Sequence, residues 1–181
     1  GADIIMRILG DMHRALGAAS YSALGLGASA KTTEVRANAA EALASLVDRG
    51  MVDTTLFAKE LYWLLNQHHV MAQRIEQTFR DAALISPLAG WRIMQVLEGI
   101  LPAVGEVNRG GTLVQLLAQL AGEYGVSIEI PEVLRPKMKG STVLAKSLRA
   151  LEKLQPHPTE LAEQARDQAQ ELLDQHRCAQ P

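Results

Sequence analysis

Hydrophobic residues recur every three or four positions along most of the chain, which is the spacing of one face of an α-helix. In residues 3–16, for example, Ile4, Ile8 and Leu16 share one face, and charged residues occupy the opposite one. The same spacing predicts helices over residues 32–49, 54–67, 70–84, 88–101, 112–124, 142–154 and 159–177, with a short glycine-weakened helix over 19–28. Together these elements predict an all-α fold.

Residues that favour helix ends stand at the boundaries of these segments. Gly50 and Gly125 follow the last hydrophobic position of their segments, where glycine closes a helix without steric cost. Pro87 suits the first turn of the helix that follows it, whereas Pro102 is expected to open a loop. Ser141 is the expected N-cap of the next-to-last helix.

The segment VSIEIPEVL, residues 126–134, is the one stretch with the alternation of a β-strand. Val126, Ile128 and Ile130 alternate with polar residues, but no partner strand is evident in the sequence. Because an isolated strand leaves its backbone N–H and C=O groups without partners, we expect an extended connector. Pro131 should open a short helical turn after it.

The stretch KTTEVRANAAEALASLVDRGMVD, residues 31–53, has the form of one helix of a repeat. With the helix that follows, it makes a pair over residues 32–67, comparable in length to a HEAT or armadillo unit. Its small alanines let neighbouring helices approach, and such a unit must stack on others to bury both faces. We therefore predict a HEAT/armadillo-like α-solenoid of stacked antiparallel helix pairs over residues 1–154, a fragment of a longer solenoid. Residues 155–181 are predicted to form a polar, acidic C-terminal helix or tail.

Four stretches between Ser22 and Leu154 carry a resemblance to a known group of proteins. They are ALGLGASAKTTEVRANAAEALASLVDRGMVD, LAGWRIMQVLEGILPAV, LVQLLAQLAGEYGVSIEIPEVL and KGSTVLAKSLRALEKL. They resemble the C-terminal part of large uncharacterised bacterial proteins with HEAT-like helical repeats. That group is associated with MoxR-type AAA+ ATPases and von Willebrand factor A-domain proteins. The resemblance implies a scaffold or adaptor with one of these proteins as partner, and it brings no catalytic motif.

The composition and charge narrow the class of protein. Hydrophobic residues make up 48% of the 181 residues, which excludes a disordered chain, and the net charge of −2 is too small to predict bulk attraction to nucleic acid or membrane. No apolar run reaches the roughly 18 residues of a membrane-spanning helix, and the first residues lack the pattern of a signal peptide. Cys178 is the single cysteine, which agrees with a reducing compartment. We predict a cytoplasmic protein.

Candidate catalytic and metal-binding residues are few. His68 and His69 are adjacent and point in different directions on a helix, which does not suit one metal ion. The glycine-containing stretches LGLGAS and NRGGT lack the complete pattern of a phosphate-binding loop. Cys178 lies in a polar tail, while Trp63 and Trp91 are expected to anchor the core. We predict no catalytic residue, no metal ion and no cofactor.

The segment PEVLRPKMKGSTVLAKSLRALEKL, residues 131–154, is the strongest candidate for binding. Its basic side chains supply the predicted anion- or partner-binding set, which is Arg135, Lys137, Lys139, Lys146 and Arg149. A helix N-terminus and basic side chains beside it can share one anion. The alternative interpretation is a solvated basic surface that the acidic residues after Pro156 offset.

The predicted function is therefore a non-enzymatic helical-repeat scaffold or adaptor that binds a protein partner in a bacterial multiprotein system. The alternative is a helical-repeat module that binds nucleic acid or phosphate through residues 135–149, although nucleic acid normally requires a wider basic surface. A third class, an enzyme with a pocket inside a helical bundle, would need a cluster of polar side chains that the spacing does not reveal.

Overall fold

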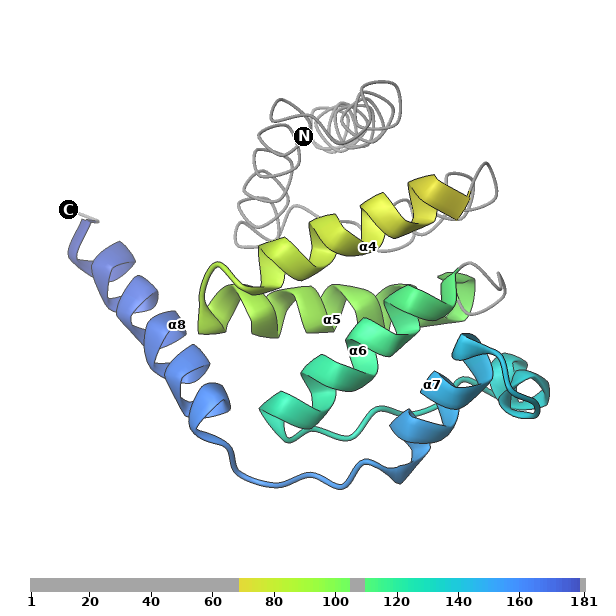
Figure 1. Ribbon diagram of the computed structural model, residues 1–181. Helices are drawn as coiled ribbons and strands as arrows, with labels where there is room; N and C mark the ends of the chain where they lie inside the picture. The colour runs from red at the N-terminus through yellow and green to blue at the C-terminus, as the bar shows by residue number, and fades with distance from the viewer. Residues whose placement is uncertain (1–68, 105–109, 180–181) are drawn as a thin grey trace.

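The computed structural model describes residues 69–104 and 110–179. This part of the chain is all-helical and contains no strand, which confirms the predicted all-α class. Its elements are α4 (His69–Ala83), α5 (Pro87–Val104), α6 (Gly111–Tyr124), the 3-10 helix η2 (Glu132–Met138), α7 (Val143–Lys153) and α8 (Glu160–Ala179) (Figure 1). The helices predicted before residue 68, the repeat pair over 32–67, Trp63 and His68 lie outside the described residues.

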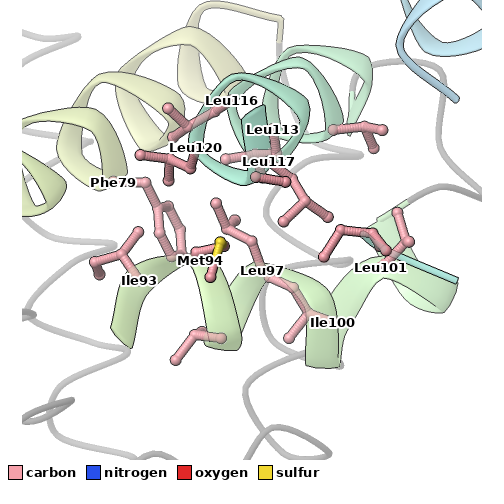
Figure 2. Packing of buried hydrophobic residues seen from close by; sticks show 14 of the residues in the cluster. Phe79, Ile93, Met94, Leu97, Ile100, Leu101, Leu113, Leu116, Leu117 and Leu120 are labelled. Carbon is pink, nitrogen blue, oxygen red and sulfur yellow. The ribbon is translucent and has the colours of Figure 1, made fainter. Parts of the chain in front are cut away.

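Helix α5 lies at the centre of the described part together with α6, since it packs against α4, α6 and α8. Its segment PLAGWRIMQVLEGILPAV is strongly apolar, as a helix contacted on several sides must be. Figure 2 shows Phe79 of α4 beside Met94 of α5, and Leu117 of α6 facing Leu97 of α5. The largest fully buried side chains of this cluster are Phe79, Ile93, Leu97, Ile100, Leu101, Leu113, Leu116 and Leu117.

The predicted loop at Pro102 is wrong, because α5 continues through this proline to Val104. Proline removes the N–H that would bond to the carbonyl of Glu98, one turn earlier. Pro102 and Glu98 are both exposed, so water can reach the freed carbonyl, while the neighbouring Leu101 stays buried in the core. Burial of the last apolar turn therefore outweighs one missing hydrogen bond.

The prediction that Gly125 closes a helix is confirmed. Gly125 follows α6 in the left-handed conformation, with φ 67° and ψ 35°, and its N–H donates to the carbonyls of Ala121 and Gly122. A Cβ at this position would overlap the carbonyl oxygen of His157 in the connection to α8. The His157 N–H in turn donates to the Gly125 carbonyl at 2.9 Å. This glycine thus ends α6 and fixes the start of the path to α8.

The segment after Gly125 is extended and leads into η2, as predicted for residues 126–134. The alternation has a packing role rather than a pairing role, because Ile128 and Ile130 are buried while Ser127 and Glu129 are exposed. Pro131 directly precedes the first residue of η2.

Helix α7 packs against α6 and begins one residue later than predicted. Thr142, not Ser141, is the N-cap, and its Oγ1 accepts a hydrogen bond from the N–H of Ala145 at 3.0 Å. Both residues are suitable caps, so the choice depends on which one places Leu144 in the core. Gly111 lets the two helices approach, since a Cβ there would lie 2.8 Å from the Leu144 nitrogen.

Helix α8 crosses the N-terminal end of α5 and then extends away from the other helices (Figure 1). Thr159 caps it by accepting a hydrogen bond from the N–H of Ala162 at 3.1 Å. The first half docks through the buried Ala165 and the partly buried Leu161 and Ala162. Residues 170–178 are all exposed. Most of the surface of α8 is therefore in solvent.

Candidate functional site

Two of the predicted binding residues, Arg135 and Arg149, make bonds between α7 and the η2 segment. Arg135 Nη1 donates to Glu152 Oε2 of α7 at 2.8 Å, and Arg135 Nε lies 3.7 Å from Glu132 Oε1. Arg149 Nη1 donates to the carbonyl of Met138 at 2.7 Å and to that of Gly140 at 2.8 Å. These arginines have intramolecular partners that fix the loop between the two helices.

The lysines of the predicted set lie in the same region of the fold. Lys137 belongs to η2 and is partly buried, whereas Lys139 follows η2 and Lys146 lies on α7, both exposed. Within the predicted set, Lys139, Lys146 and Arg135 are exposed, and of these three Arg135 is engaged with Glu152.

A pocket that sequence reasoning did not find lies between α5 and α8. Its cavity volume is about 430 Å³, and its lining residues are Leu88, Trp91, Arg92, Gln95, Ala162, Ala165, Arg166 and Ala169. Each helix contributes residues at steps of three, one and three positions, which is one face of an α-helix. The pocket thus forms between two helix faces that look toward each other.

Small residues on α8 leave this space open. Ala162, Ala165 and Ala169 occupy positions where leucine would reach across to α5. The two helices are held at this point by a hydrogen bond from the Leu88 N–H to Gln168 Oε1, at 2.9 Å. Leu88 is in the first turn of α5, where backbone N–H groups have no partner within the helix. A side chain of α8 therefore supplies the partner that this N–H needs.

Tyr124 of α6 supports the wall of the pocket from behind. Its ring meets the indole of Trp91 edge to face, with centroids 5.7 Å apart and an interplanar angle of 70°. Its hydroxyl donates to the carbonyl of Pro87. Gly90 makes room for this contact, because a Cβ there would overlap the Tyr124 hydroxyl. Trp91 packs partly against the core, as predicted, and its remaining surface lines the pocket.

The tyrosine behind the pocket is neutral, and the charged side chains that line the pocket are both cations. Burial raises the pKa of Tyr124 to about 12, with a smaller contribution from the nearby Glu123, so the hydroxyl stays protonated at neutral pH. Arg92 and Arg166 carry a permanent charge, and no carboxylate is among the lining residues. The pocket therefore combines two cations and the Gln95 amide with an otherwise apolar lining.

Other candidate chemistry is sparse in the described part of the chain. Residues 69–104 and 110–179 contain no group of three or more His, Cys, Asp or Glu that could hold a metal ion. Cys178 and His157 are exposed. Within the same residues, every helix is too short or too polar to cross a membrane.

Comparison of the chain with protein-family models, with curated proteins and with solved structures gives no match.

Proposed function

We propose that this chain is a non-enzymatic scaffold or adaptor, built of HEAT-like helical repeats, that acts in the cytoplasm by binding another protein. One observation carries the proposal, which is the exposed distal half of α8. There Leu172 and Leu173 are 49% and 52% exposed on a helix that has left the core. An isolated solvated helix has no need of adjacent leucines, whereas a helix that enters the groove of a partner does.

The neighbouring charges define the kind of partner. Asp167, Glu171 and Asp174 share a shallow surface of α8 with Cys178. A complementary partner has an apolar groove for the leucines and basic residues along its rim. Complete burial of a leucine contributes about 1.5–3 kcal/mol, so covering two half-exposed leucines contributes about 2 kcal/mol in total.

The resemblance in sequence supplies the first partners to test. We propose a MoxR-type AAA+ ATPase or a von Willebrand factor A-domain protein encoded beside the gene. A stack of HEAT-like pairs presents a long concave surface, and α8 at its end would add a second contact. The proposal assigns this chain no catalytic step and no cofactor.

A double variant of α8 tests the proposal. Leu172→Gln with Leu173→Gln should weaken binding to the purified partners by roughly 10- to 30-fold, which corresponds to about 2 kcal/mol. Both side chains are half exposed, so helix content measured by circular dichroism should not change. Val133→Thr is the control, because Val133 is a 54% exposed apolar residue on η2, away from α8.

Two results would overturn this assignment. One is equal binding of the double variant and the unmodified chain to the same partner. The other is equal capture of the purified partner by a photo-crosslinker at position 172 whether residue 173 is leucine or glutamine.

Residues 135–149 support a second candidate function, the binding of nucleic acid or phosphate. The exposed Lys139 and Lys146 favour it. The bonds that Arg135 and Arg149 make within the fold leave fewer cationic side chains to contact a phosphate. A salt titration of binding to duplex and single-stranded DNA tests it, because phosphate contacts weaken steeply with salt. Absence of DNA binding at low salt would rule out this second function.

A further inference from the structure

We propose that the pocket between α5 and α8 binds a small organic carboxylate with a compact apolar body. This inference is independent of the proposed protein partner, since the pocket lies on the docked half of α8 and the exposed leucines lie on the distal half. Its volume of about 430 Å³ falls in the lower part of the range of natural ligand pockets.

The charges of the lining select an anion. Arg92 of α5 and Arg166 of α8 both line the pocket, so each of its two walls contributes a cationic residue. Arg92 also interacts within the protein, which leaves Arg166 as the more exposed of the two cations. Guanidinium groups bind carboxylates through paired N–H···O bonds, and their charge persists at every physiological pH. Gln95 adds an amide that can donate to a carboxylate oxygen or accept from a polar substituent.

The rest of the lining selects an apolar body. Leu88 and Trp91 form one wall, and Ala162, Ala165 and Ala169 form the other. Inorganic phosphate or acetate would leave these surfaces against water, whereas a phenyl or branched alkyl group would cover them and contribute hydrophobic binding energy. The Trp91 ring is already fixed by Tyr124, so a flat group can pack on it with little loss of side-chain freedom.

A bound ligand would also join the two helices. The described contacts that dock α8 include its small alanine side chains, the partly buried Leu161 and the bond from the Leu88 N–H to Gln168. A ligand that contacts both helices binds only when α8 is docked, and it stabilises the docked state by mass action. Amide hydrogens of α8 should therefore exchange more slowly in its presence.

The experiment uses the full chain with Trp63→Phe, which leaves Trp91 as the only tryptophan and makes its fluorescence a reporter of the pocket. The probe is 4-phenylbutyrate, compared with its neutral amide, with acetate and with inorganic phosphate. We expect 4-phenylbutyrate to change the Trp91 emission with saturation and to bind at least about tenfold more tightly than the other three, because each lacks either the charge or the apolar body.

Variants of α8 assign the site. Arg166→Met should weaken 4-phenylbutyrate at least about tenfold, while Arg177→Met, an exposed arginine on the same helix outside the pocket, should leave it unchanged. Arg166 is chosen over Arg92 because Arg166 is exposed, whereas Arg92 is partly buried and interacts within the protein. Ala169→Leu fills the pocket without changing its charge and should abolish binding.

Each contrary result is decisive. Equal binding of the neutral amide shows an apolar cavity without anion selectivity. Equal binding of acetate or phosphate shows a surface charge effect. Absence of saturation, or equal effects of Arg166→Met and Arg177→Met, places any binding elsewhere. All of these outcomes overturn the proposal while leaving the role of Leu172 and Leu173 to its own test.

Discussion

Replacing Tyr124 with phenylalanine removes a single hydroxyl from the contact between α6 and the start of α5. The phenol is 2% exposed, and its hydroxyl donates to the carbonyl of Pro87. The ring that packs edge to face on Trp91 remains in the variant. The change therefore isolates one buried hydrogen bond, and a typical net value predicts a loss of about 1 kcal/mol in the free energy of unfolding at pH 7.

This stability difference should depend on pH, and its sign follows from the raised pKa. The folded Tyr124 has a pKa of about 12, mainly because burial disfavours the phenolate. In the unfolded chain a tyrosine ionises near pH 10. The unfolded state thus loses its proton first, so the contribution is complete below pH 10 and is lost as the pH rises toward 12. At pH 11 linkage predicts a loss of roughly 1 kcal/mol in the unmodified chain that Tyr124→Phe cannot show.

Urea unfolding of both chains at pH 7, 9, 10 and 11 measures this difference. Ionisation of lysines and of the other tyrosines occurs in both chains and cancels when their free energies of unfolding are subtracted. We expect the advantage of the unmodified chain to hold up to about pH 9 and nearly to vanish by pH 11. A constant advantage over that range would refute the placement of this hydroxyl in a protected environment.

Three further substitutions test a helix end, a helix N-cap and an ion pair of the fold. Gly125→Ala should lower the free energy of unfolding by about 2–3 kcal/mol, because it forces a left-handed alanine against the His157 carbonyl. An unchanged urea midpoint would contradict this geometry. Thr159→Ala should lower the stability of α8 alone by about 1 kcal/mol, which makes amide exchange in α8 roughly fivefold faster. An equal increase in exchange across all helices would contradict a local cap. Glu152→Gln should change the free energy of unfolding by less than about 0.5 kcal/mol, since its ion pair with Arg135 is half exposed. A loss above about 1 kcal/mol in urea unfolding would contradict this expectation.

Much of the described fold could be predicted from local chemistry. Gly125 ends α6 because its left-handed conformation suits glycine, and Pro87 begins α5 because the first turn does not need its N–H. Pro102 misled the prediction, because the cost of a proline inside a helix depends on whether the freed carbonyl is exposed. That exposure follows from packing and cannot be seen in a linear sequence.

The pocket is different, since neither of its walls has a distinctive sequence. Trp91 alone suggests a core position, and Arg166 alone suggests a solvated helix. The informative feature is the alanine pattern at positions 162, 165 and 169 on a helix with few large apolar residues. Such a pattern indicates close docking to another element, but only the fold shows that α5 is that element. The basic segment was visible in sequence, yet the intramolecular partners of Arg135 and Arg149 were not.

The same alanines determine how firmly α8 is docked. A buried methyl group contributes about 0.8 kcal/mol and a hydrogen bond about 1 kcal/mol, so the alanine face, the partly buried Leu161 and the Leu88–Gln168 bond together contribute a few kcal/mol. A ligand at a hundred times its dissociation constant contributes about 2.7 kcal/mol to the state that it binds, which is comparable. A pocket ligand would therefore add substantially to the docking of α8. If a protein partner binds Leu172 and Leu173 only while α8 is docked, the carboxylate and the partner must each raise the other's affinity by the same factor. A partner that binds equally well with and without 4-phenylbutyrate would show that the two halves of α8 act independently.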